Sequence, residues 1–425
     1  MPSATFMNAL RTFVFVCFLV FVVQPDAAAQ NSWIATWATS PQPVAPDPKK
    51  PLLNIDGQTV RERVRVSIGG SQIRIRFSNE YGSAPVVIGA ATVALPSDAA
   101  SVKPGSIQAL TFDGRSSVTI PVGAPMLSDP LPFPLPPGAE ISISIYFPKR
   151  TAVPTGHWMA LKRAAISQHG DYTRAEKIEG GAVTASSILL TAVLVPAQTS
   201  LRLVVAFGDS ITDGDGSTVD ADDNWPSDLA RRLAKARDGS NVAVVNEGIV
   251  GTRVLNDCFM PNLGCYGVSA LARFDRDALG LPGVTHVVLL QGINDIGFPG
   301  AKLGEQYLAD PAAMRTADDL IAAYLQLISR AHIRGVKVIG ATITPFEGVD
   351  LPGYYSETKE ATRQSINKWI RTSGSFDGVA DFDAVLRDPD HPSRLLPKFA
   401  FEDHLHPNVA GYRAMADAID LALFK

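Results

Sequence analysis

Residues 201–210 read Leu-Arg-Leu-Val-Val-Ala-Phe-Gly-Asp-Ser, and this stretch decides the fold that we expect for the second half of the chain. Residues 203–207 are all apolar, which is typical of a strand covered on both faces of a parallel sheet. Gly208 permits a tight turn after the strand and leaves Ser210 at the strand end. Ligands of open α/β sheets bind at that end, so Ser210 is a candidate functional residue. Gly-Asp-Ser alone is also an ordinary turn sequence.

Similar apolar runs recur downstream and alternate with amphipathic helix patterns. The clearest helix is expected to begin at a capping box formed by Thr316 and Asp319 and to stop at Gly335. A last helix is expected after Pro407 and carries Met415, Ile419 and Leu423 on its apolar face. This alternation predicts an α/β region with a parallel sheet over residues 201–425. The further strands are expected at 242–246, 284–290 and 336–343.

Residues 30–196 follow a different pattern. Apolar and polar residues alternate with a period of two at 64–68 and 73–77, with Gly69-Gly70 between them. This pattern predicts a half-buried β-hairpin with arginines on its open face. Gly and Pro clusters separate the later runs, as in an all-β sandwich. We therefore expect an all-β, sandwich-like domain at 30–196, with further strands at 86–95, 107–112, 118–122 and 141–147.

The length of the chain agrees with two domains, and its charge argues against a nucleic-acid partner. The chain has 425 residues, more than one hydrophobic core usually supports. Its formal net charge is -4, so the chain lacks the excess of positive charge that attracts nucleic acid.

The first 29 residues have the pattern of a secretory signal peptide. Arg11 precedes an apolar run over 13–23, and three alanines at 27–29 offer a cleavage site near Ala29. The alternative is a membrane anchor, but the run is short against the roughly 20 residues that span a bilayer. We expect a secreted or periplasmic protein without a transmembrane segment in its mature chain. Cleavage would leave Cys258 and Cys265, which we expect to form a disulfide in an oxidising compartment.

Near the end of the chain, residues 403–407 read Asp-His-Leu-His-Pro and offer a partner for Ser210. A serine hydroxyl becomes a useful nucleophile only when a base lies within hydrogen-bond reach and a third group orients that base. The spacing lets Asp403 hold one ring nitrogen of His406 while the other nitrogen faces Ser210. His404 is a rival base, and the segment could instead be a polar turn that caps the final helix.

Two further strand ends offer donors for the oxyanion of acyl transfer. Gly248 follows the second strand of the α/β region, and its backbone N–H is unobstructed by a side chain. Asn294 follows the third strand and carries a side-chain amide. Loss of one such donor typically costs about 3 to 4 kcal/mol of transition-state stabilisation.

Four motifs in this order resemble the consensus blocks of the SGNH (GDSL-like) hydrolases, and the resemblance covers residues 201–425. It implies a flavodoxin-like, three-layer α/β/α domain in which Ser210 is the nucleophile and His406 and Asp403 complete a triad. It also implies that the N–H groups of Ser210 and Gly248 and the side chain of Asn294 form the oxyanion hole. The front region resembles the β-rich extension of some secreted bacterial members. The motifs are Gly208-Asp209-Ser210, Gly248, Gly292-x-Asn294-Asp295 and Asp403-x-x-His406.

We therefore expect a secreted serine carboxylester hydrolase that cleaves short-chain acyl esters, with acetyl favoured, on carbohydrates, through an acyl-enzyme. The alternatives are a lipase or general esterase acting on lipids or small esters, and a glycan-binding module with an inert hydrolase domain.

The reaction requires neither cofactor nor metal. The acidic run over 213–223 departs from a calcium loop at Thr218 and Asn224, so we expect a solvated acidic loop. His391, within Asp-Pro-Asp-His-Pro, is typical of a surface turn.

Overall fold

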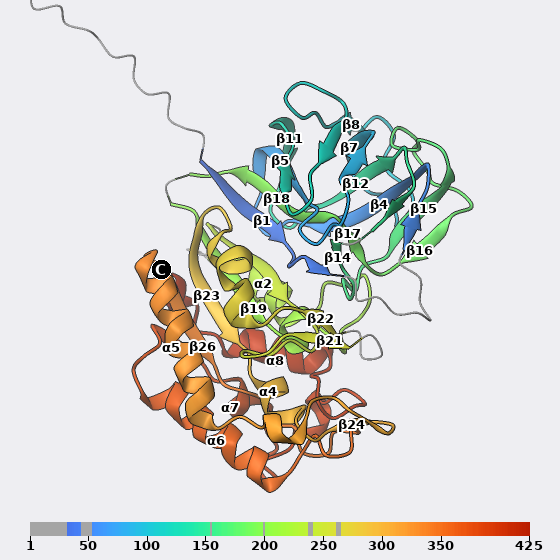
Figure 1. The fold of residues 1–425 in the computed structure, drawn as a ribbon. Coiled ribbons are helices and arrows are strands. Elements are labelled where there is room, and N and C mark those ends of the chain that lie inside the picture. The colour runs from blue at the N-terminus through green and yellow to red at the C-terminus, as the bar shows by residue number, and fades with distance from the viewer. Residues whose placement is uncertain (1–31, 44–52, 154, 199, 237–240, 261–264) are drawn as a thin grey trace, which may run out of the picture.

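The computed structural model describes residues 32–43, 53–153, 155–198, 200–236, 241–260 and 265–425. Its ribbon shows a β-rich region in the first half of the chain and an α/β region in the second half (Figure 1). The predicted signal peptide, with its cleavage site near Ala29, lies outside the described residues. Within the described ranges, no helix has the length and apolar character needed to span a bilayer.

The α/β region is built on one parallel sheet of five strands in the order β20-β19-β23-β26-β27. Numbered along the chain, that order is 2-1-3-4-5, the flavodoxin-like arrangement, and the α/β prediction is confirmed. The switch in strand order lies between β19 and β23, where a ligand is expected. The strands are β19 Arg202–Gly208, β20 Val242–Gly248, β23 Val284–Leu290, β26 Lys337–Ala341 and β27 Gly378–Ala380.

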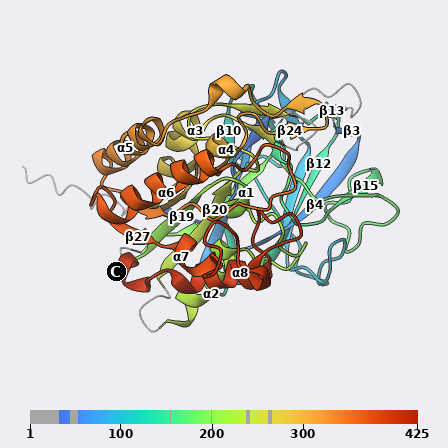
Figure 2. The ribbon, with the colours of Figure 1, turned by 90° about the horizontal axis from the view of Figure 1, so that it is seen from below.

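Helices cover both faces of this sheet. Figure 2 shows α5 and α6 on one side of the strands and α2, α7 and α8 on the other. The predicted capping box opens α5, because the Thr316 hydroxyl accepts from Asp319 N at 3.2 Å and the Asp319 carboxylate accepts from Thr316 N at 2.9 Å. The last helix is shorter than predicted, since α8 ends at Ala418 and a 3-10 turn occupies Leu421–Phe424. The α-helices are α1 Ser210–Asp213, α2 Trp225–Lys235, α3 Ala270–Phe274, α4 Ile293–Gly297, α5 Ala317–Ile333, α6 Glu357–Thr372, α7 Phe382–Leu386 and α8 Val409–Ala418.

The β-rich region contains two larger sheets, and its predicted β character is confirmed. One sheet has the order β1-β18-β5-β10 with β11 also on β5, and the other has the order β16-β15-β4-β12-β7-β8. The longer strands are β1 Trp33–Ala38, β4 Gln58–Arg65, β5 Gly70–Ser78, β7 Ala90–Ala94, β11 Leu131–Leu135, β12 Glu140–Phe147, β15 Ala164–His169 and β18 Leu190–Pro196.

The remaining strands are short. In the β-rich region they are β2 Gln42–Pro43, β3 Asn54–Ile55, β6 Val86–Ile88, β8 Gln108–Ala109, β9 Val118–Ile120, β10 Pro125–Leu127, β13 Thr151–Ala152, β14 Thr155–His157, β16 Ala182–Thr184 and β17 Ser187–Ile188. In the α/β region they are β21 Cys258–Met260, β22 Cys265–Gly267, β24 Lys302–Leu303 and β25 Gln306–Tyr307.

The hairpin predicted around Gly69-Gly70 is wrong, because β4 and β5 belong to different sheets. β4 pairs with β12 and β15, whereas β5 pairs with β18, β10 and β11. The glycines carry the chain from one sheet to the other, and a Cβ on Gly69 would lie 2.1 Å from the Leu135 carbonyl oxygen. Arg65 is exposed as predicted, whereas Arg61, earlier in the same strand and outside the predicted alternation, is not. Arg61 is buried, and its guanidinium donates to the carbonyls of Ala100 and Ala175 at 2.9 and 2.7 Å.

Ion pairs join the two regions, and they correct the prediction of a solvated acidic loop. Arg63 Nη2 lies 3.0 Å from Asp220, and Arg65 Nε lies 2.8 Å from Asp222. Asp222 also lies 2.7 Å from the ammonium of Lys162. The loop after α1 is therefore acidic because it contacts the cationic face of the β-rich region.

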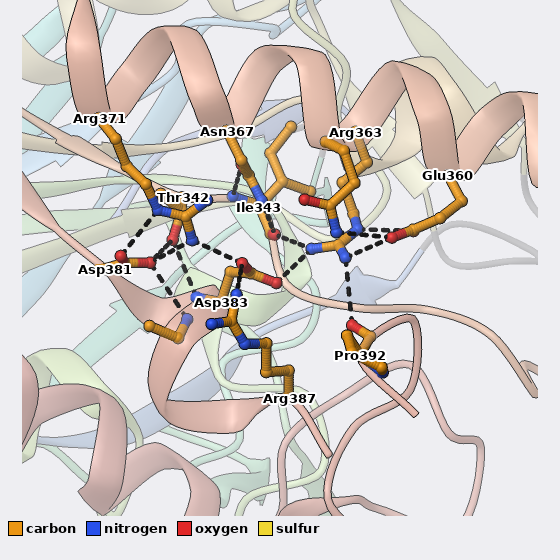
Figure 3. A network of polar contacts seen from close by, with 12 residues as sticks. Thr342, Ile343, Glu360, Arg363, Asn367, Arg371, Asp381, Asp383, Arg387 and Pro392 are labelled. Carbon is orange, nitrogen blue, oxygen red and sulfur yellow. Dashed lines mark hydrogen bonds and ion pairs between the residues drawn. The ribbon is translucent and has the colours of Figure 1, made fainter. Parts of the chain in front are cut away.

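A buried ion network fixes the segment that follows β26 (Figure 3). Arg363 donates to Asp383 at 2.6 Å, to Glu360 at 2.6 Å and to the Ile343 carbonyl at 2.8 Å. The side chains of Arg363 and Asp383 are both 0% exposed. Arg371 reaches the other oxygen of Asp383 at 2.5 Å, so one carboxylate joins two positions of α6 to α7.

Arg363→Met is expected to lower the free energy of unfolding by about 3 kcal/mol, because it removes one partner from a buried ion pair. Urea unfolding followed by circular dichroism measures the change. The matched control is Lys177→Met, which breaks an exposed pair with Glu179 (62% and 74% exposed) and should cost under about 1 kcal/mol. Equal losses in the two variants would contradict the prediction.

Candidate active site

The strand-to-helix turn after β19 holds Ser210 at the first position of α1. Asp209 is the N-cap, and its carboxylate accepts from Ile211 N at 3.1 Å. Position 208 has no room for a side chain, because a Cβ there would lie 2.1 Å from Thr212 Oγ1 and 2.4 Å from the Leu290 carbonyl oxygen. Glycine is therefore required at this position. Ser210 is therefore presented at the carboxyl edge of the sheet, between β19 and β23.

The structure brings the three predicted triad residues together. His406 Nε2 lies 2.7 Å from Ser210 Oγ, and His406 Nδ1 lies 2.5 Å from Asp403 Oδ2. The other oxygen of Asp403 accepts from the backbone N–H groups of Leu405 and His406, both at 3.0 Å. The carboxylate thus fixes the fold of its own turn as well as the orientation of the ring.

His404, the rival base, does not share this arrangement. Its backbone has φ of 57°, in the left-handed region, and its side chain is exposed. The left-handed residue turns the chain between Asp403 and His406, so that these two side chains meet. His406, and not His404, therefore contacts Ser210.

Carboxylates near His406 raise the pKa of its ring. Burial alone would lower the pKa of this imidazole, but the hydrogen bond to Asp403 and the negative charges of Asp215, Asp403 and Asp209 outweigh burial and raise it. Burial would raise the pKa of Asp403, yet its bond to His406 and the charge of the ring lower it. Asp215 was not predicted as a site residue, and its Oδ2 lies 3.8 Å from His406 Nε2. A proton taken by His406 is therefore held between two carboxylates.

Asn294 lies in α4, at the carboxyl end of β23, and is 3% exposed. Its Nδ2 donates to the Thr252 carbonyl at 3.1 Å, and its Oδ1 accepts from the Tyr354 hydroxyl at 3.0 Å. These bonds fix the amide, and no residue that the structure describes accepts its second N–H, which remains for a ligand. The neighbouring Asp295 accepts from Val254 N at 2.7 Å and so anchors the loop after β20. Burial raises the pKa of Asp295 to about 6.

The N–H of Gly248, which was predicted to be an oxyanion donor, has a partner within the chain. It donates to Asn246 Oδ1 at 2.9 Å, within the end of β20. The glycine is needed for packing instead, because a Cβ there would lie 2.2 Å from the backbone nitrogen of Asp213 in α1. Gly251, which we did not predict, has φ of 71° and precedes Thr252, the residue bonded to Asn294. Among the described residues, none accepts the Gly251 N–H.

A cavity of about 350 Å³ lies between the two regions. Its lining includes β4, the outer face of α2 and the end of β20, but not Ser210, His406 or Asp403. This cavity is therefore distinct from the space in front of the serine hydroxyl.

Other predicted features can be placed as well. His391 is exposed, as expected of a surface turn. Cys258 is disulfide-bonded, whereas the side chain of Cys265 lies outside the described residues, so the pairing stays a prediction. Across the described ranges there is no group of three or more His, Cys, Asp or Glu side chains that could hold a metal ion.

Comparison with known proteins gives one family match. Residues 206–414 match the GDSL-like Lipase/Acylhydrolase family. No curated protein sequence matches the chain. Similar solved structures include a lipolytic protein of the G-D-S-L family from Desulfitobacterium hafniense, with 20% identity, a TM-score of 0.36 and coverage of 51% of this chain and 96% of that one. A GDSL-like lipase from Bacteroides thetaiotaomicron has 18% identity, a TM-score of 0.38 and coverage of 54% and 90%. An acetylxylan esterase from Geobacillus stearothermophilus, solved as a catalytic mutant, has 19% identity, a TM-score of 0.37 and coverage of 52% and 93%.

Proposed function

Since the chain belongs to the GDSL-like lipase/acylhydrolase family through residues 206–414, and is thus a hydrolase of esters, we propose that Ser210, His406 and Asp403 are its catalytic triad. The observation that carries the proposal is the unbroken contact chain of 2.7 Å from Ser210 Oγ to His406 and 2.5 Å from His406 to Asp403. Nucleophile, base and orienting acid are within hydrogen-bond reach, as acyl transfer requires.

The reaction follows from this geometry. His406 Nε2 takes the proton of the Ser210 hydroxyl while Oγ attacks the ester carbonyl carbon, and Asp403 stabilises the imidazolium that forms. The tetrahedral oxyanion accepts hydrogen bonds, and its collapse breaks the bond to the leaving alcohol, which takes the proton from His406. A water molecule then gives its proton to His406 and attacks the acyl-enzyme, so that the acid leaves and the Ser210 hydroxyl is restored.

We propose that the oxyanion donors are the Asn294 amide and the backbone N–H groups of Ser210 and Gly251, with Gly251 in place of Gly248. The fixed Asn294 amide and its bond to Thr252, beside Gly251, support this choice. The bond from the Gly248 N–H to Asn246 argues against the earlier assignment.

For the substrate we propose short-chain acyl esters, acetyl above all, carried on a carbohydrate. Ser210 is 4% and His406 is 7% exposed, and such narrow access favours a small acyl group. The β-rich region of an exported protein favours a polymeric carbohydrate by analogy of fold. Action on lipids or small esters is the second candidate, and a glycan-binding role with an inert domain is the third. The assembled triad argues against an inert domain.

We propose export from the cytoplasm as well, with cleavage near Ala29. The signal-peptide pattern of residues 1–29 supports this, and so does the disulfide at Cys258, because disulfides persist in oxidising compartments. We also regard the β-rich region as a sandwich of its two larger sheets.

The test of substrate is a series of p-nitrophenyl esters from acetyl through butyryl and octanoyl to palmitoyl. We expect kcat/KM to be highest for acetyl and to fall about tenfold or more by octanoyl, because the little exposed surface of Ser210 and His406 gives a long acyl chain poor access. Release of acetate from an acetylated polysaccharide then tests whether the acyl group is carried on a carbohydrate.

An activity that rises with chain length would favour the lipase candidate. No turnover of any ester, together with glycan binding by the full chain, would favour the inert-domain candidate.

A further inference from the structure

We propose that the β-rich region positions the nucleophile of the α/β region through a buried pair, His157 and Asp213. His157 would then be a positioning residue for the reaction although it touches no substrate. This inference rests on the proposed function of Ser210, which lies in the same short helix as Asp213.

His157 ends β14 in the β-rich region and is 2% exposed. Its Nε2 lies 3.0 and 3.1 Å from the two carboxylate oxygens of Asp213, and its Nδ1 lies 3.0 Å from the Ser40 carbonyl oxygen. A ring nitrogen that faces a carbonyl oxygen must carry a hydrogen, and the other nitrogen shares a proton with the carboxylate. The ring is thus held from both sides, and neither nitrogen is available as a second base.

Asp213 connects three parts of the structure through its backbone and its carboxylate. It is the last residue of α1, and its backbone N–H donates to the Asp209 carbonyl at 2.9 Å. The backbone N–H of Val250, the residue before Gly251, also acts on this carboxylate, because it lowers the pKa that burial raises. The nucleophile helix, the loop that carries a proposed oxyanion donor, and the β-rich region therefore meet at Asp213.

Ser40 adds a second connection at the same place. The Ser40 hydroxyl donates to Glu247 Oε2 at 2.5 Å and accepts from Arg273 Nη1 at 3.0 Å. Arg273 Nη2 in turn donates to the Gly208 carbonyl at 2.6 Å, two residues before Ser210. Arg273 and Glu247 are both buried. The β-rich residue that holds His157 thus also supports the strand end that presents the nucleophile.

The chemical consequence is a specific kinetic defect. Without His157, the buried carboxylate of Asp213 loses the ring that shares its proton, and the end of α1 is expected to shift relative to Val250. Ser210 and the Gly251 N–H would then move relative to each other, which weakens binding of the transition state more than binding of the ester. The defect is expected in kcat, with KM nearly unchanged.

The experiment is a double-mutant cycle on the full chain with His157→Gln, Asp213→Asn and both together. A fluorophosphonate that labels Ser210 counts the active sites, so that kcat is expressed per titrated site and loss of folded protein does not mimic the effect. We expect His157→Gln to lower kcat for p-nitrophenyl acetate about tenfold to a hundredfold, since small misplacements of reacting groups have effects of this size. In the Asp213→Asn background the same change should cost less than about threefold, because no charge is left unpaired.

The matched control is Arg65→Gln, which breaks the 2.8 Å ion pair with Asp222 at the same interface but makes no hydrogen bond or ion pair with α1 among the described residues. Its kcat should stay within about twofold of wild type. Equal losses in the control and in His157→Gln, additive effects in the cycle, or an unchanged kcat in His157→Gln would each overturn the proposal.

Two further outcomes are also decisive. If His157→Gln yields no folded protein, the kcat of Asp213→Asn is the test. An unchanged kcat in that variant overturns the proposal. If the wild type hydrolyses no ester, the proposed function fails by itself. The rate of fluorophosphonate labelling of Ser210 then replaces kcat in the same comparison.

Discussion

Ser210→Ala is expected to lower kcat for p-nitrophenyl acetate by about 10,000-fold or more, the size of effect seen when a triad nucleophile is removed. Alanine has no oxygen to attack the carbonyl, so the acyl-enzyme cannot form, whereas the oxyanion donors remain and sustain only slow hydrolysis. Initial rates of p-nitrophenol release, compared with the rate in buffer, measure the loss.

The control is Ser217→Ala, in the same loop region but outside the triad. It should retain activity within about twofold, because Ser217 is only half-buried and its change removes a single hydroxyl outside the triad. Near-normal turnover by a folded Ser210→Ala variant would refute the proposed function.

His406→Gln is expected to lower kcat about 10,000-fold, whereas His404→Gln should change it by less than about twofold. Glutamine at 406 can still fill the space beside Asp403, but it cannot take a proton from Ser210 Oγ at neutral pH. The two histidines are one residue apart, and only His406 lies against the serine, at 2.7 Å. Steady-state rates with the same acetyl ester separate the two variants.

Thermal unfolding of both histidine variants completes the comparison. His406→Gln must remain folded for its loss to count as chemical. A large loss in His404→Gln with activity retained in His406→Gln would exchange the assigned roles of the two residues.

The α/β region could be predicted well because its signals are local. The apolar run of β23 and the capping box of α5 lie where the sequence pattern placed them. The β-rich region was predicted less well, because alternation identifies a strand but not its partner. β4 and β5 have the expected pattern, yet the turn at Gly69-Gly70 joins two sheets instead of closing a hairpin. That difference depends on contacts with distant residues such as Leu135.

The candidate site divides in the same way. Ser210, His406 and Asp403 could be found because each lies in a short motif at a strand or loop end. Asp215 and His157 were missed, since one is an ordinary loop aspartate and the other lies 56 positions from its partner in the sequence. Gly248 was chosen because it comes soon after the strand predicted at 242–246, and only the hydrogen bonds of the folded chain point to Gly251 instead.

β20 is an edge strand of the parallel sheet, and this position bears on aggregation of the protein. An edge strand has unpaired backbone N–H and C=O groups that can pair with a strand of another chain, which leads to aggregation. Here the Val244 N–H donates to the Ser67 hydroxyl of the β-rich region at 3.1 Å, and β1 packs nearby. We therefore expect a chain trimmed to its hydrolase half to expose this strand and to associate with other copies, which the intact chain avoids.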